Sequence, residues 1–142
     1  LIKRPRGRRR GPLVPVKIDS RDKRILILLS ALSEPVSKLR LHRMVKELQD
    51  RGVRFGFRFL GEGKPYSSEL QSRLERLVDR GYVFRLYLVG NRFYDLYEDY
   101  YTITDKGKKV AERMDVDKKD IRRILDYVKE IKSLSSSGEP TE

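Results

Sequence analysis

Residues with phosphate-binding chemistry are concentrated at the start of the chain, in "LIKRPRGRRRGPLVP". The planar guanidinium group of arginine can donate two parallel hydrogen bonds to a phosphate. The same segment is rich in proline and glycine and has almost no apolar periodicity, so it cannot fold alone. We expect residues 1–18 to form a flexible basic tail that becomes ordered along a nucleic acid or an acidic partner. Its candidate binding residues are Arg4, Arg6, Arg8, Arg9 and Arg10.

The charge of the whole chain changes sign from front to back. The formal net charge is +12; residues 1–24 hold ten basic and two acidic side chains, whereas residues 95–142 hold ten basic and twelve acidic ones. Such asymmetry is expected of a protein that lays one end on a polyanion. The alternative is a solvated thermophilic surface, since the chain is rich in Lys, Arg and Glu and has one Asn and two Gln.

A second candidate binding region lies in "GKPYSSELQSRLERLVDR", where leucines at helical spacing predict a helix over residues 68–80. Ser, Gln and Arg on its outward face can read base edges, and its first backbone N–H groups favour phosphate. Glu75 and Asp79 would meet phosphates if the whole helix docked, so we expect contact through the first turn. The candidate residues are Lys64, Ser67, Ser68, Gln71, Ser72, Arg73 and Arg76.

A β-hairpin is predicted after this helix. Residues 82–89 and 92–103 are rich in Tyr, Phe, Val and Leu, and Gly90-Asn91 fits a two-residue turn between them. We expect Arg85 and Arg92 on the hairpin to hold the flanking phosphate backbone. The turn predicts the pairs Leu88 with Phe93, Phe84 with Tyr97, and Leu86 with Asp95.

The remaining elements are mostly helical. Apolar periodicity predicts helices over residues 21–31 and 38–50, and Ser37 is the expected N-cap of the second. A short helix capped by Asp105 and a final helix follow the hairpin, while residues 53–60 read as an extended segment or bent loop.

Two stretches resemble known proteins. "RGYVFRLYLV" and "YYTITDKGKKVAERM" resemble the wing entry and exit of prokaryotic winged-helix regulators, which often carry Tyr-x-Leu-Thr-x-x-Gly after the wing. Tyr101, Thr104 and Gly107 keep that spacing, with Ile103 in the Leu place. "RFGFRFLGEGKPYS" is similar to a segment of small prokaryotic proteins, some linked to toxin–antitoxin systems, that carry Tyr-Gly-Tyr and then Gly-Pro-Tyr-Ser; Lys64 replaces the Gly.

The resemblance implies a mainly α fold with a β-hairpin: a winged helix-turn-helix domain over residues 19–115. The basic tail precedes it, an extra C-terminal helix over residues 116–134 follows, and residues 135–142 form a flexible end. The resemblance also implies a DNA-binding transcriptional regulator. The apolar stripe of the last helix suggests a homodimer through residues 116–134, the alternative being that this helix packs on its own domain.

Two other functions remain open. An RNA- or ribosome-associated protein would use the Arg-rich tail as its main anchor, and an antitoxin-like interaction module would use its acidic final third. Duplex DNA is the favoured partner and RNA the second.

Signals for enzymatic or metal chemistry are missing from the sequence. The chain has no Cys, and its one histidine, His42, is expected to be half-exposed or held by a neighbour. "GEG" at residues 61–63 is too short for a phosphate loop. We therefore expect no catalytic residues, metal or cofactor. No apolar run reaches the ~18 residues of a membrane span, and no secretory signal is visible, so we expect a cytoplasmic protein.

Overall fold

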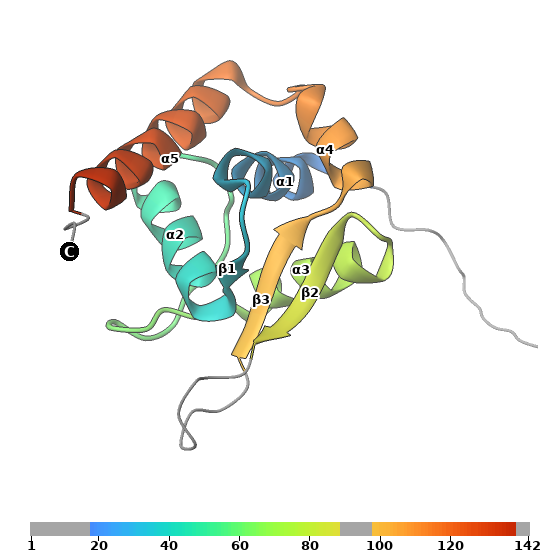
Figure 1. Ribbon diagram of the computed structural model, residues 1–142, viewed down its shortest axis with the longest axis horizontal. Coiled ribbons are helices and arrows are strands. Elements are labelled where there is room, and N and C mark those ends of the chain that lie inside the picture. Colours follow the sequence, from blue (N-terminus) through green and yellow to red (C-terminus); the bar gives the residue numbers. More distant parts are fainter. Residues whose placement is uncertain (1–17, 89–97, 139–142) are drawn as a thin grey trace, which may run out of the picture.

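The computed structural model describes residues 18–88 and 98–138 (Figure 1). These residues form five helices and a small three-stranded antiparallel sheet, an arrangement compatible with a winged helix. The elements in chain order are α1 (Ser20–Leu32), β1 (Val36–Ser37), α2 (Lys38–Asp50), α3 (Ser68–Asp79), β2 (Val83–Leu88), β3 (Glu98–Ile103), α4 (Asp105–Glu112) and α5 (Lys118–Gly138).

The helices begin close to where the sequence predicts. Asp19 caps α1 in a reciprocal capping box, and the side chains of Ser37 and Ser67 accept backbone N–H bonds at the starts of α2 and α3. The predicted cap of α4 is wrong by one residue. Thr104, and not Asp105, has the extended backbone and accepts the N–H bond.

The sheet has the strand order β1-β3-β2, and its first strand was not predicted. The two residues of β1, Val36 and Ser37, pair with Tyr101 and Tyr100 of β3. A strand this short carries no periodicity that a sequence pattern could reveal. Its pairing brings the start of α2 to the outer edge of β3 (Figure 1).

The predicted hairpin register is wrong. Leu88 pairs with Glu98, where the two-residue turn required Phe93. Leu86 accordingly lies opposite Tyr100, which removes the unfavourable pairing of a half-buried leucine with Asp95. The register of a hairpin depends on which side chains lie on its buried face as well as on its turn, and here the observed register follows the buried face. The predicted turn residues lie outside the described part of the chain.

The core surrounds α1, whose residues 25–29 are all apolar and at most 2% exposed. A helix that is apolar on every side must be covered on every side. The sheet, α4 and α5 all pack on it (Figure 1). The helix α5 contributes Ile124, Tyr127 and Val128 to this core, so one side of the helix packs on its own chain.

The segment between α2 and α3 is extended but does not join the sheet. Val53, Phe55 and Phe57 are buried and alternate with exposed residues. The side-chain amide of Gln49 bonds both backbone groups of Phe57, with its Oε1 accepting at 2.9 Å and its Nε2 donating at 2.8 Å. Gly56 has φ +67°, a left-handed conformation that glycine adopts without strain. This segment leads the chain to the loop before α3.

Candidate nucleic-acid interface

A buried histidine fixes the start of α3. The backbone N–H of Ser67 donates to Nδ1 of His42 at 3.1 Å, so the ring proton lies on Nε2 and donates to Oε1 of Gln71, also at 3.1 Å. Burial lowers the pKa of His42; the neighbouring charge of Lys38 adds to this, and the bond to Gln71 opposes it. The neutral ring is therefore the form that fits. Of the two predicted alternatives for His42, the structure shows the second: the ring is fully buried and is held by its neighbours.

The network continues from Gln71 to the sheet. Its Nε2 donates to the hydroxyl of Tyr101 at 2.9 Å and to Glu75 at 3.2 Å. Ser67 and Gln71 are 0% and 6% exposed, so neither can reach a ligand as the sequence analysis expected. Their polar groups instead join α2, α3 and β3, because a buried polar group must be hydrogen-bonded.

Arg73 is also engaged within the protein. Its Nη1 lies 2.6 Å from a carboxylate oxygen of Asp19 and 3.1 Å from one of Asp22, and its side chain is 18% exposed. Burial raises the pKa of Asp19, but the hydrogen bond from Arg73 and nearby backbone donors outweigh this and hold the pKa below its usual value. The predicted phosphate ligand Arg73 therefore joins α3 to the cap of α1.

The exposed face of α3 carries Ser68, Ser72 and the partly exposed Arg76, which the sequence analysis named as candidates. A shallow cleft of about 490 Å³ runs along this face. The exposed Glu69, Glu75 and Asp79 share the face, and one of them, Glu69, accepts a bond from the backbone N–H of Arg58. Three carboxylates against one arginine disfavour docking of the whole helix along a phosphate backbone. The residues that line the cleft are Glu69, Ser72, Arg73, Glu75, Arg76 and Asp79.

Four cations gather beside the start of α3. Three of them lie on the first turns of α2, and the fourth lies in the loop that precedes α3. We call Lys38, Arg40, Arg43 and Lys64 the α2 basic patch. Arg40, Arg43 and Lys64 line one cleft of about 400 Å³, together with one carboxylate, Glu47. Arg43 donates to the carbonyl oxygen of Gly63 at 3.2 Å, which holds the loop against the helix. Among residues 18–87 and 99–134, whose side chains the structure describes, no carboxylate forms an ion pair with any of the four cations.

An aromatic residue joins this patch to the buried network. The ring of Tyr66 stacks on His42 with centroids 4.6 Å apart and an interplanar angle of 6°. Lys38 Nζ lies 5.7 Å from the centroid of the Tyr66 ring, which remains exposed at its edge. Backbone bonds of 2.9 Å in both directions between Leu60 and Tyr66 close the loop that carries Lys64. The histidine network thus positions the patch as well as α3.

Among these four residues, only Lys64 is a site residue predicted from the sequence. Lys38, Arg40 and Arg43 are residue types that any solvated face of an amphipathic helix carries. The spacing of three between Arg40 and Arg43 places them on one face, but the loop that meets this face is distant in sequence. Only the fold shows that Lys64 joins them.

Of the two candidate phosphate ligands on the hairpin, the structure describes Arg85 but not Arg92. Burial lowers the pKa of Arg85, but interactions with Tyr101 and Tyr87 outweigh this and raise it above its usual value, and its Nε is buried with no hydrogen-bond partner within the described residues. Arg85 is thus partly used inside the sheet. Arg92 and the five tail arginines lie outside the described residues, so their roles stay predictions. Ser37, the cap of α2, pairs with Tyr100, so the α2 basic patch lies near the start of β3 (Figure 1).

Comparison with known proteins gives no relative. No protein-family model matches the chain. No curated protein matches it significantly. No solved structure matches it significantly either. Among the described residues, no group of three or more His, Asp or Glu side chains is arranged to hold a metal ion. None of the described helices combines the length and apolar character that crossing a membrane requires.

Proposed function

We propose that this chain is a DNA-binding regulator of the winged-helix type that holds duplex DNA mainly through the phosphate backbone. The observation that carries the proposal is the α2 basic patch, four cations without a described carboxylate partner beside the first turn of α3. Unpaired cations release condensed counterions when they meet phosphate, which is the main source of sequence-independent affinity.

The order of elements supports the winged-helix assignment. One helix, a short strand, two helices and a hairpin follow each other, and the short strand joins the hairpin in one sheet. In helix-turn-helix proteins the second helix of the pair presents its first residues to the major groove. Here that helix would be α3, and Ser68 and Ser72 are the exposed candidates in its first two turns.

The composition of α3 supports weak sequence preference. Phosphate contacts position a protein on DNA, whereas contacts to base edges specify the sequence. Gln71 and Arg73, the side chains best suited to bidentate base contacts, are engaged inside the protein. Base reading is left to Ser68, Ser72 and Arg76, with carboxylates on either side.

RNA binding is a second candidate, and exposed aromatic residues favour it. Tyr66, Phe84 and Tyr87 all expose more than a third of their surface. Aromatic rings stack on unpaired bases, and such stacking tolerates any base sequence. The same four cations would then hold a single-stranded backbone.

The test compares salt-dependent binding of the full chain with that of an Arg40→Ala/Arg43→Ala variant. Each phosphate contact contributes about 0.9 to the slope of log K against log salt on duplex DNA, so losing two contacts should lower the slope by about 1.8. A Lys108→Ala/Lys109→Ala variant removes the same charge from exposed positions of α4 and should lower the slope by less.

The probes are a random-sequence DNA duplex, the corresponding single-stranded RNA and a structured RNA hairpin, each measured by fluorescence anisotropy. A larger slope change for the α2 variant on the duplex supports the proposal. Equal slopes for the two variants would contradict it. A strong preference for single-stranded RNA that Tyr66→Ala abolishes would select the second candidate instead.

A further inference from the structure

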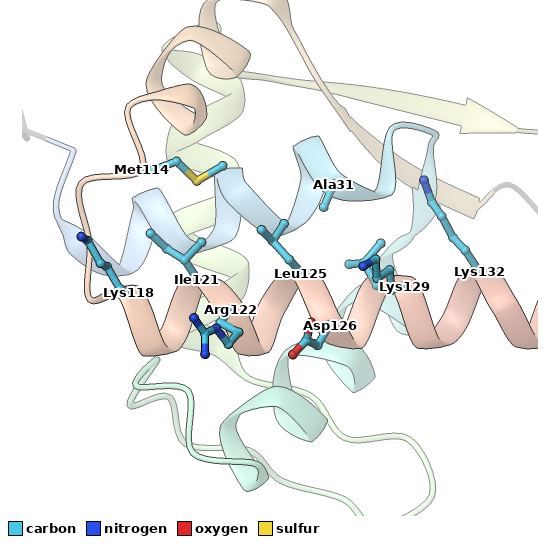
Figure 2. A pocket seen from close by; sticks show the side chains of 10 residues that line it. Ala31, Met114, Lys118, Ile121, Arg122, Leu125, Asp126, Lys129 and Lys132 are labelled. Atoms are coloured by element: carbon cyan, nitrogen blue, oxygen red, sulfur yellow. The ribbon is translucent and has the colours of Figure 1, made fainter.

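A groove between α1 and α5 forms an open apolar recess. It has a volume of about 730 Å³, and its floor combines side chains from α1, α5 and the link before α5. Figure 2 shows Ile121 and Leu125 pointing from α5 toward α1, with Met114 above them. Leu125 is 37% exposed and Met114 42%, so this apolar surface is left open to solvent. The apolar lining residues are Ala31, Met114, Ile121, Leu125 and Val128.

The border of this groove is strongly basic. Lys118, Arg122, Lys129 and Lys132 line it, together with a single carboxylate, Asp126. Figure 2 shows Lys118 and Lys132 at opposite ends of the apolar row. Lys132 donates to the hydroxyl of Ser33 at 3.3 Å, but no carboxylate in the described ranges forms an ion pair with any of these four cations. An apolar floor with a basic border is complementary to an occupant that has an apolar face flanked by acidic groups.

A second copy of the chain is a poor occupant. A two-fold axis through Leu125 would pack the exposed apolar residues of two α5 helices on each other in antiparallel orientation. The same axis places Lys118 opposite Lys132 and brings Arg122 to within one residue of Lys129 of the other copy. Like charges directly opposed across an interface disfavour it. The homodimer expected from the sequence through residues 116–134 is therefore disfavoured on this face.

A nucleic acid also fits the groove poorly. The four cations would suit phosphates, but the backbone of a duplex offers no apolar groups to cover Ile121 and Leu125. An amphipathic helix satisfies both halves of the groove, since apolar residues spaced three and four apart can enter it while acidic residues flank them. Lys118 and Lys132 are separated by fourteen helical positions, or about 21 Å, which matches a partner helix of about four turns.

We propose that the α1–α5 groove binds an acidic amphipathic helix of a partner protein. The apolar face of that helix covers Ile121, Leu125 and Met114, and its Asp or Glu side chains meet the four border cations. The groove shares no residue with the α2 basic patch, so the chain can hold a partner helix and a nucleic acid on different surfaces.

The test is a selection from a display library of random helical peptides about 16 residues long, which span about 24 Å. The full chain is the target, at about 150 mM salt, where exposed charges more than roughly 8 Å apart are largely screened. We expect enriched peptides to be acidic, with apolar residues at positions i, i+3 or i+4, and i+7. Selection of basic peptides, or of sequences without this periodicity, would overturn the proposal.

One selected peptide is then measured against matched variants by fluorescence anisotropy. Leu125→Gln and Lys118→Glu/Lys132→Glu should each weaken binding about tenfold, as expected for central interface residues. Two controls should change affinity less than about twofold, within what a surface position away from the contact allows. They are Leu134→Gln, exposed and outside the groove lining, and Lys108→Glu/Lys109→Glu, which makes the same charge change on α4.

Three results would refute the assignment of the groove. The first is an affinity that Leu125→Gln leaves unchanged while circular dichroism shows a folded chain. The second is a dimer in light scattering that Leu125→Gln dissociates, because the occupant is then a second copy. The third is a loss of duplex DNA affinity in Lys118→Glu/Lys132→Glu as large as the loss of peptide affinity. Failure of nucleic-acid binding at the α2 basic patch leaves this proposal unaffected.

Discussion

Replacing His42 with leucine tests whether the buried network holds α2, α3 and the loop together. The leucine leaves the backbone N–H of Ser67 and Oε1 of Gln71 buried without their partner. Each unsatisfied buried group costs about 1–3 kcal/mol, so the free energy of unfolding should fall by about 2–6 kcal/mol. Loss of the stacked contact with Tyr66 adds to this. The measurement is equilibrium urea unfolding followed by circular dichroism.

A matched control on the same helix is Lys46→Leu. Lys46 forms only an exposed ion pair with Asp50, so its loss should change the free energy of unfolding by less than about 1 kcal/mol. An effect of His42→Leu no larger than that of Lys46→Leu would refute the argument that these hydrogen bonds position α3.

The pH dependence gives an independent readout of the same histidine. Because burial lowers the pKa of His42 in the folded state, the unfolded chain binds a proton more readily at this position. The stability that His42 contributes is fully present above its ordinary pKa of about 6.5 and is lost as the pH falls below that value toward the folded pKa. Protonation of Nδ1 would also remove the acceptor of the Ser67 N–H.

Other charged groups lie around the ring, so the comparison with a variant is necessary. Lys38 lies near the ring on α2, and Glu75 bonds Gln71 on its far side. Both remain in His42→Gln, which cannot titrate. Between about pH 7.5 and 5.5 the wild-type chain should lose stability relative to this variant as the pH falls. Parallel profiles for the two proteins would show that His42 is not the titrating group.

Two further substitutions test how tightly the rest of the fold is specified. Arg24→Met removes the 2.9 Å partner of the Asp120 carboxylate, which is 1% exposed. Arg54 and Arg123 remain 3.5 and 3.6 Å from that carboxylate, so the free energy of unfolding should fall by about 1–3 kcal/mol in denaturant titration. A change below about 1 kcal/mol would contradict a stabilising role for the buried ion pair. Gly107→Ala places a Cβ atom 2.2 Å from the carbonyl oxygen of Tyr82 and should lower the free energy of unfolding by about 1–3 kcal/mol. In Gly63→Ala the added Cβ has no other heavy atom within 4 Å, so the melting temperature should stay nearly unchanged. Equal melting temperatures for these two alanine variants would show that the contact at Gly107 is not as close as described.

The helices were predictable because their apolar spacing and caps are local in the sequence. Ser37 is an N-cap in both the prediction and the structure, and Gly52 and Gly81 take the positive φ that ends a helix. The strand β1 and the hairpin register were not predictable. They depend on which residues meet across distant elements, and a local turn motif at Gly90 suggested the wrong pairing.

The candidate site was predictable by region but not by residue. Residue type alone selected Gln71 and Arg73, because amide and guanidinium groups suit base edges. The same chemistry suits a buried network, and His42 and Asp19 are the partners that use it here. Arg40 was overlooked since nothing in its own helix distinguishes it from a solvated residue. Gln71 and Arg73 have hydrogen-bonding or ion-pair partners nearby in the fold, whereas Arg40 has no described carboxylate partner.

The charge gradient of the sequence has a second meaning in the structure. Basic residues near the front of the chain pair with acidic residues near its end, so the fold itself uses part of the asymmetry. The positive charge that matters for a polyanion is therefore the part without an internal carboxylate, which makes the α2 basic patch and the groove border more informative than the net charge of +12. Removing the more exposed acidic partners, Asp115, Asp117 and Glu130, should leave more cations unpaired and raise sequence-independent nucleic-acid affinity. The ion pairs that join the two ends are Lys23–Asp115, Arg24–Asp120, Arg51–Glu130 and Arg54–Asp117.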